Sequence, residues 1–203
     1  MEIKDTRVYD LEESIVASGF PMNTSELYND FDKQFDIIKF NKHKKRAIKL
    51  ANTSSSSGHC NFLSGILVSF NIKYPQYFAM QLQRYHFVQI VSSASKMHRL
   101  TNMGMPKEGE TLIDSKILNI CNAMIKEYNS TEHTGEKKEI FEELINSLPM
   151  GFQLWMRCTT NYLQLKTIYK QRRNHKLEEW QQFCEWIETL PLSELIIADK
   201  YKK

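Results

Sequence analysis

The segment GHCNFLSGILVSFNI, residues 58–72, decides the fold. A Gly-His loop leads directly into an apolar run that is rich in β-branched residues. In this run Ile66, Val68 and Phe70 occupy alternate positions. Because alternation with a period of two is typical of a strand with one buried face, the segment predicts a buried strand over 62–72.

The segments that follow predict a mixed α/β chain. Pro75 opens a helical pattern that reaches Val88 and would place Gln81 and Arg84 on one helix face, one turn apart. Further along, the pattern predicts two amphipathic helices over 113–129 and 139–148 around a polar connector, a strand over Phe152–Thr160, and helices around Leu165 and Trp180. No internal repeat is present, so we expect a single domain over 1–203.

The composition indicates a globular protein with a sizeable core. The chain has 203 residues, of which 41% are hydrophobic and 25% charged, and its net charge of +3 is too weak to argue for nucleic acid. Its four cysteines form no C-x-x-C pair, and we interpret them as reduced residues of the core. We therefore expect no bound metal. The charged N-terminus and the lack of a long apolar run predict a cytoplasmic protein without membrane contact.

The densest cationic run is KFNKHKKRAIK, residues 39–49. The run predicts a helix with one apolar face and solvated lysines. The alternative is a phosphate-binding patch or a helix that docks on nucleic acid, which would make the chain an interaction protein. Nucleic acid as a partner is the weaker expectation, because the net charge is small.

Common catalytic and phosphate-binding motifs are absent from the sequence. It contains no G-x-G-x-x-G or Walker loop, no H-E-x-x-H, no G-x-S-x-G and no EF-hand pattern. The sequence therefore does not indicate a dinucleotide-binding loop, a zinc protease, an α/β-hydrolase or a calcium site. No catalytic residue can be assigned from the sequence.

Two polar constellations remain. The first lies in QLQRYHFVQIVSSASKMHR, residues 81–99, where arginines and serine hydroxyls suit a phosphate and a glutamine could read a pyrimidine edge. The second surrounds Trp180, an apolar anchor, and comprises Asn161, Gln164, Thr167, Arg172, Arg173 and His175. Taken singly, each of these residues could equally belong to a solvated helix face.

Together, these segments resemble the flavin-dependent thymidylate synthases. In that family a Gly-His loop leads into a strand that ends in Thr-Phe, and the next helix carries Gln-x-x-Arg-His-Arg. The matching residues here are Gly58-His59 in the loop, Ser69-Phe70 at the strand end, and Gln81 and Arg84 in the helix. Near the C-terminus, Arg172 stands at the family's nucleotide-binding arginine and Trp180 at its tryptophan. The resemblance covers residues 55–100 and 150–190.

The chain also departs from the family pattern. Tyr85 and His86 stand where the family has histidine and arginine, and Thr167 replaces an asparagine that contacts flavin. A histidine supplies no permanent charge at neutral pH, so contacts to flavin are weakened. Nucleotide binding is therefore the firmer expectation. In form the chain looks like short phage and Firmicute relatives with an incomplete signature.

The resemblance implies an α/β (α+β) fold with a central twisted sheet flanked by helices. It also implies a homotetramer with sites between subunits. Each site would bind FAD and a dUMP-like pyrimidine nucleotide. The implied reaction transfers a methyl or hydroxymethyl group to uracil C5, using a folate one-carbon donor and NADPH. The alternative is a non-catalytic nucleotide-binding sensor, sponge or regulator on the same scaffold.

The residues that the resemblance implies fall into two groups. Those expected to bind the nucleotide are Gln81, Arg84, Ser93, Ser95, Arg99 and Arg172. Those expected to bind the cofactor are His59, Asn61, Tyr85, His86, Thr167, Arg173 and His175.

Overall fold

The computed structural model describes residues 1–22, 37–53 and 57–197. Its strands are β1 (Glu2–Tyr9), β2 (Leu67–Pro75), β3 (Gln89–Ser93) and β4 (Gln153–Asn161). Its α-helices are α1 (Leu11–Ala17), α2 (Ile37–Ala51), α3 (Gln76–Leu82), α4 (Lys96–Met103), α5 (Ser115–Ser130), α6 (Thr134–Ser147), α7 (Tyr162–Arg172) and α8 (Glu178–Glu188). Short 3-10 turns are η1 (Phe20–Met22), η4 (Asn61–Ser64) and η5 (Ser193–Leu195).

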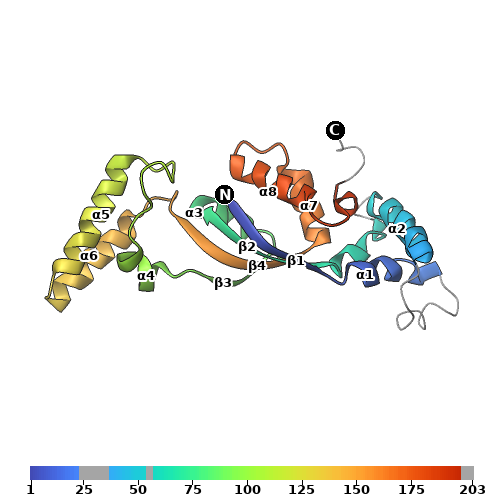
Figure 1. Cartoon of the computed structure of the whole chain (residues 1–203), viewed down its shortest axis with the longest axis horizontal. Helices are drawn as coiled ribbons and strands as arrows, with labels where there is room; N and C mark the ends of the chain where they lie inside the picture. The colour runs from blue at the N-terminus through green and yellow to red at the C-terminus, as the bar shows by residue number, and fades with distance from the viewer. Residues whose placement is uncertain (23–36, 54–56, 198–203) are drawn as a thin grey trace.

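The molecule is elongated, with a curved sheet in the middle, an arm of α4, α5 and α6 at one end, and α1 and α2 at the other (Figure 1). The sheet is antiparallel with the strand order β1-β2-β4-β3. Helices α7 and α8 cover one face of it (Figure 1). The predicted combination of a twisted sheet with flanking helices is thus confirmed.

The central strand β2 follows the predicted alternation. Val68, Phe70 and Ile72 are fully buried, whereas Leu67 is 40% exposed. The predicted start of the strand at residue 62 is wrong, because Asn61–Ser64 form the 3-10 turn η4. The N–H of Gly65 closes that turn by donating to the carbonyl of Phe62 at 3.1 Å, and the extended backbone begins only after it.

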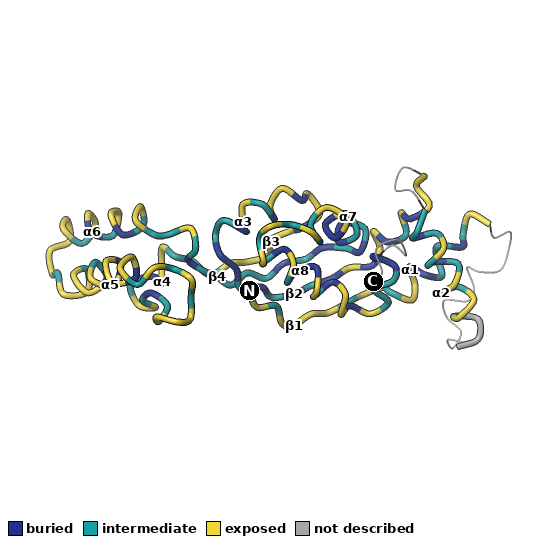
Figure 2. Tube along the Cα trace, turned by 90° about the horizontal axis from the view of Figure 1, so that it is seen from above, coloured by how far each residue is buried: buried dark blue, intermediate teal, exposed yellow. Residues whose placement is uncertain are grey.

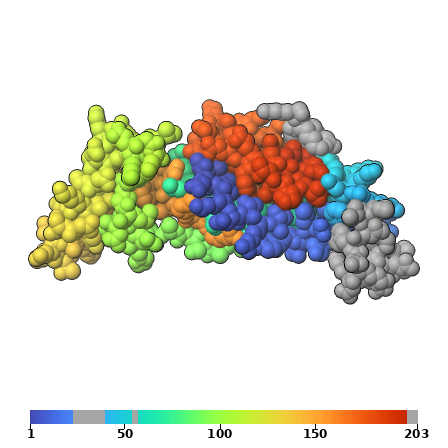
Figure 3. Space-filling view, viewed as in Figure 1, coloured from blue at the N-terminus to red at the C-terminus, as the bar shows by residue number. Residues whose placement is uncertain are grey.

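Aromatic rings fill the space between the sheet and α8. Phe78 lies 4.4 Å from Trp180 between ring centroids, and Phe70 lies 4.6 Å from Trp186. Trp186 also donates from its indole nitrogen to the Thr6 hydroxyl at 3.1 Å. The first strand and the last helix therefore lie side by side, as the blue and red surfaces in Figure 3 show.

The helical arm has a hydrophobic cluster of its own, in which Leu118, Cys121 and Leu144 are buried. The predicted amphipathic helices are confirmed as α5 and α6, but α6 begins at Thr134, inside the segment predicted as a connector. Figure 2 shows exposed residues along the arm's outer faces. Because the arm and the main body bury separate clusters, the single domain over 1–203 stays a prediction.

The helix predicted from Pro75 to Val88 is too long. It begins after Pro75 as expected, but α3 ends at Leu82, so Arg84 does not share a helix face with Gln81. The chain turns instead, with the N–H of Tyr85 donating to the carbonyl of Leu82 at 3.1 Å. Pairing of the following residues with β4 as the edge strand β3 outweighs the local helical pattern.

The basic run forms the surface helix α2, as the first interpretation predicted. Ala47 is buried and Ile48 packs against the core, while Lys42, Lys45 and Lys49 are exposed. Two cations of this helix have partners: Lys44 forms an ion pair of 3.1 Å with Glu194, and Arg46 donates to the carbonyls of Ile15 and Val16 and to Ser18, which ties α2 to the end of α1. Within the described ranges, no helix is long and apolar enough to cross a membrane.

Candidate functional site

The polar side chains that the sequence singled out meet around the indole of Trp180. This tryptophan is fully buried on α8, and its ring nitrogen donates a hydrogen bond of 2.8 Å to the side-chain oxygen of Gln81. The guanidinium of Arg172 lies over the same indole, 4.8 Å from its centroid. We call this group the Trp180 cluster; its members are Gln81, Tyr85, Gln171, Arg172, His175 and Trp180.

Local hydrogen bonds hold the hairpin of α7 and α8 that carries most of this cluster. Asn161 caps α7 by accepting from the N–H of Gln164 at 2.8 Å. After the last turn of α7, the His175 ring nitrogen Nδ1 accepts from the N–H of Leu177 at 3.1 Å. The His175 ring meets Trp180 edge-on at 6.3 Å. Because of this turn, Arg172 and Trp180 lie on the same side of the hairpin.

Arg172 is held from two directions. Its Nε donates to the Tyr85 hydroxyl at 2.8 Å, and its guanidinium faces the indole of Trp180. The Tyr85 hydroxyl in turn donates to Oε1 of Gln171 at 3.0 Å. Among the described residues, the two terminal nitrogens of Arg172 have no hydrogen-bond or ion-pair partner. They are donors that a ligand with paired oxygen atoms could use.

The orientation of the Gln81 amide follows from its partner. An indole N–H can only donate, so the atom of Gln81 that faces Trp180 must be the carbonyl oxygen. The amide nitrogen of this half-buried side chain is therefore the end available to a ligand, and it is a donor.

The other predicted nucleotide-binding residues are not members of the Trp180 cluster. Arg84 is exposed in the turn after α3, Ser93 is exposed on β3, and Arg99 is exposed on α4. Ser95 is the N-cap of α4, where its oxygen accepts from the N–H of His98 at 3.3 Å. Apart from the backbone N–H of Arg84, which donates to the carbonyl of Gln81 at 3.3 Å, no hydrogen bond or ring contact within the described ranges joins these four residues to the Trp180 cluster.

The predicted cofactor-binding residues are dispersed. Tyr85 and His175 belong to the Trp180 cluster, whereas His59, Asn61 and His86 are exposed in loops and turns. Thr167 is exposed on α7 and donates to the carbonyl of Leu163 at 3.2 Å. These assignments stay predictions.

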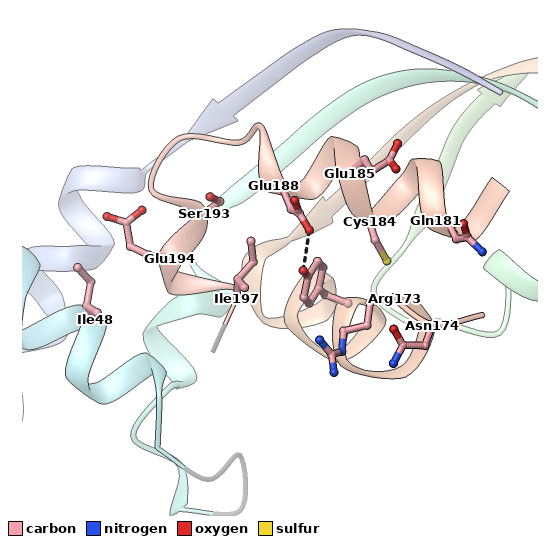
Figure 4. Close-up of a pocket in the computed structure, with 11 residues that line it drawn as sticks. Ile48, Arg173, Asn174, Gln181, Cys184, Glu185, Glu188, Ser193, Glu194 and Ile197 are labelled. Atoms are coloured by element: carbon pink, nitrogen blue, oxygen red, sulfur yellow. Dashed lines mark hydrogen bonds between the residues drawn. The ribbon is translucent and has the colours of Figure 1, made fainter. Parts of the chain in front are cut away.

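Arg173 lines a groove between α2, α7, α8 and η5, with a volume of about 900 Å³ (Figure 4). Across this groove the Tyr169 hydroxyl donates to Glu188 at 2.6 Å. Burial, with the nearby Glu188, raises the pKa of the Cys184 thiol to about 12, so this cysteine is inert at neutral pH. The lining is completed by Ile48, Asn174, Gln181, Glu185, Ser193, Glu194 and Ile197.

A metal centre has no ligand set in the part of the chain that the structure describes: no group of three histidine, cysteine, aspartate or glutamate side chains could hold an ion there. The cluster's chemistry is that of hydrogen-bond donors and one fixed cation. Such a set binds and orients an oxygen-rich ligand.

Comparison with solved structures identifies the fold. The flavin-dependent thymidylate synthase ThyX from Helicobacter pylori, complexed with FAD and dUMP, matches with a TM-score of 0.70 and 14% identity over 100% of both chains. Another structure of the Helicobacter pylori protein with FAD and dUMP gives 0.69 and 15%, covering 98% of each chain. The UMP/dUMP methylase PolB from Streptomyces cacaoi, bound with 5-Br dUMP, gives 0.60 and 14%, covering 97% of this chain and 94% of that one.

The chain therefore has the flavin-dependent thymidylate synthase fold, as the sequence motifs predicted. No protein-family model and no curated protein matches its sequence. The likeness thus lies in the backbone, while most side chains differ.

Sequence reasoning missed one member of the cluster, Gln171. Its side-chain oxygen accepts from Tyr85, a residue 86 positions away in sequence. A buried tyrosine hydroxyl needs a partner, so the sequence signal was the need for an acceptor near Tyr85. Which residue would meet that need could be learned only from the fold.

Proposed function

We propose that the chain binds a pyrimidine nucleotide of the dUMP kind at the Trp180 cluster, as a protein of the flavin-dependent thymidylate synthase type. One observation carries this proposal: Arg172 and Gln81 are both fixed against the buried Trp180, and both keep donor groups that have no partner among the described residues. The structural neighbours, which are complexed with dUMP or 5-Br dUMP, support it.

The free amide nitrogen of Gln81 suits a keto oxygen of the base. Uracil presents keto oxygens on its ring edge, whereas cytosine presents an amino group, which is a donor, at C4. Two donors facing each other lose a hydrogen bond and leave a polar group unpaired, which costs affinity. The site would therefore favour uracil nucleotides.

Oxygen atoms of the nucleotide would be held by Arg172 through its two terminal nitrogens. Arg84, Ser93, Ser95 and Arg99 are proposed as the phosphate side of the site, on the basis of the resemblance. The Ser95 oxygen accepts from the backbone of His98, so its hydroxyl proton is left to donate to a phosphate oxygen.

FAD is proposed as the cofactor because the Helicobacter pylori neighbours are complexed with it. The proposed flavin residues fit it in part: His59, Asn61 and His86 are exposed and can donate hydrogen bonds, but these three supply no permanent charge for the pyrophosphate, and the permanent cation of the set, Arg173, lines the other groove. When bound, a reduced flavin would supply the electrons for one-carbon transfer to uracil C5, with a folate donor and NADPH as further reactants.

A homotetramer with sites between subunits is part of the same proposal. Large apolar side chains lie uncovered near the proposed phosphate side: Phe87 is 66% exposed, Val91 63% and Met97 59%. Another copy of the chain would cover such side chains and complete the site. Location in the cytoplasm is proposed on the sequence alone.

The visible absorption spectrum of the purified protein mixed with FAD, recorded while dUMP is added, tests this function. A flavin spectrum that shifts from that of free FAD and changes saturably with dUMP supports the enzyme type. The alternative, a non-catalytic nucleotide binder, is favoured by His86 and Thr167 at the family's flavin positions. It predicts an unshifted flavin spectrum together with saturable dUMP binding in a parallel calorimetric titration. Absence of both responses contradicts the two functions together.

A further inference from the structure

The position of Tyr85 in the Trp180 cluster indicates a role other than direct contact with a bound ligand. Its side chain is only 8% exposed, and its ring meets Trp180 edge-on at 5.8 Å. Its hydroxyl accepts from Nε of Arg172 at 2.8 Å and donates to Oε1 of Gln171 at 3.0 Å. Arginine only donates and the amide oxygen Oε1 only accepts, so the two partners together fix the direction of both hydrogen bonds.

These two bonds leave the Tyr85 hydroxyl without a proton to offer a ligand. The one O–H hydrogen goes to Gln171, and the guanidinium of Arg172 occupies a lone pair of the oxygen. Tyr85 therefore acts through Arg172 and not directly on a bound molecule.

The same bonds restrict Arg172. A free arginine side chain has many rotamers, and ordering them on binding costs affinity. Here Nε is tied to Tyr85, and the guanidinium lies 4.8 Å from the Trp180 centroid and 5.7 Å from the Tyr85 centroid. The terminal nitrogens of Arg172 can change direction only if the side chain leaves its contacts with Tyr85 and Trp180. The two donors are therefore ordered before a ligand binds.

We infer that Tyr85 is a positioning residue that orders Arg172 for the nucleotide, with Gln171 holding the Tyr85 hydroxyl in turn. The inference rests on the proposed function, because it takes Arg172 as a nucleotide contact. It assigns a role to the tyrosine that stands where the related family has histidine.

The test compares Tyr85→Phe with Tyr169→Phe. Tyr169 is a good control, because it is 5% exposed, lies on the same helix as Arg172, and donates to Glu188 in the other groove. Both variants lose one hydroxyl and one hydrogen bond to a side-chain acceptor. Thermal unfolding shows that each variant is folded, and dUMP affinity is then measured by calorimetry.

Two readouts separate positioning from a structural role. The first is the solvent-exchange rate of the Arg172 Nε–H by NMR in the ligand-free protein, with the resonance assigned from its loss in Arg172→Lys. The second is a double-mutant cycle of Tyr85→Phe with Arg172→Ala on dUMP affinity.

Faster Nε–H exchange in Tyr85→Phe, with dUMP affinity about tenfold lower only when Arg172 is present, is the expected result. Unchanged exchange in Tyr85→Phe overturns the inference, and so does an equal loss of affinity in the Arg172→Ala background or in Tyr169→Phe. If the wild-type protein binds no dUMP, the proposed function fails, while the exchange rate still decides whether Tyr85 orders Arg172.

Discussion

The indole nitrogen of Trp180 donates to the side-chain oxygen of Gln81 at 2.8 Å, and so connects α8 to the last turn of α3. This one bond fixes which end of the Gln81 amide faces outward. Since the outward end is the nitrogen, the proposed site offers a donor to the base. In the proposed function, the choice between uracil and cytosine would thus depend on Trp180, a residue that need not touch the nucleotide.

Replacing Trp180 with phenylalanine should reduce selectivity for dUMP over dCMP by about tenfold, because the Gln81 amide becomes free to rotate and present either end. The ratio of the two dissociation constants, measured by calorimetry, checks this. Trp186→Phe is the matched control, since Trp186 lies on the same helix and donates to Thr6 far from Gln81. A selectivity ratio that is unchanged in Trp180→Phe would contradict the role of the indole.

Ser95 is predicted to have two separable roles, as the N-cap of α4 and as a phosphate contact. Ser95→Ala should lower the free energy of unfolding by about 1 kcal/mol, because the N–H of His98 loses its acceptor. Ser95→Asp should keep the cap and restore stability, yet repel a phosphate and weaken dUMP binding by at least about tenfold. Chemical denaturation and calorimetry on both variants measure the two effects. A Ser95→Asp protein that binds dUMP like the wild type would leave Ser95 as a helix cap alone.

The link between α1 and α2 should be sensitive to a single methyl group. A Cβ added at Gly19 would lie 2.6 Å from the guanidinium carbon of Arg46, which three hydrogen-bond acceptors hold in place. Gly19→Ala should therefore cost about 1–3 kcal/mol of stability in urea unfolding. At Gly135, by contrast, an added Cβ would make only ordinary contact at 3.5 Å with His133, so Gly135→Ala should leave stability unchanged or slightly raised. Equal stability of the two variants would show that Arg46 does not hold this link.

Stability should fall at alkaline pH through the buried thiols. Burial raises the pKa of Cys158 to about 11 and that of Cys184 to about 12, from an ordinary value of 9.0. Below pH 9 both folded and unfolded thiols are protonated, and no stability is lost. Above it the unfolded state releases protons that the folded state retains, so the free energy of unfolding decreases as pH rises from 9 towards 11 and 12.

Urea unfolding at a series of pH values across this window measures the slope for the wild type and for Cys158→Ala combined with Cys184→Ala. The double variant is expected to start less stable, because two core side chains are truncated, and to lose stability less steeply. Identical slopes would show that the two thiols do not contribute.

The strands that could be predicted from the sequence are those with one buried face. In β2 apolar residues alternate with polar ones, and β4 begins with the apolar run Leu154, Trp155 and Met156, so both signals are local. β1 and β3 were missed because they are edge strands: all five residues of β3 are exposed, and β1 reads EIKDTRVY with six exposed positions. Their extended form comes from pairing with β2 and β4, which no local pattern records.

The candidate site was predictable in its residue types and not in its connections. Gln81, Arg172 and Trp180 stand out because their spacing resembles a known family. Their mutual contacts depend on α3 ending at Leu82, which lets the chain turn and bury Tyr85 beneath Arg172. That turn is fixed by sheet pairing further along the chain, so the helical pattern alone pointed to the wrong neighbour, Arg84.

Calorimetric titration of dUMP into the wild-type protein, Arg172→Ala and Lys170→Ala tests the central claim most directly. Lys170 is an exposed cation on the same helix, so its removal controls for the lost charge. We expect saturable binding by the wild type and Lys170→Ala, with affinity at least about tenfold lower in a folded Arg172→Ala protein. Equal affinity in all three proteins, or no binding by the wild type, would contradict a nucleotide site at the Trp180 cluster.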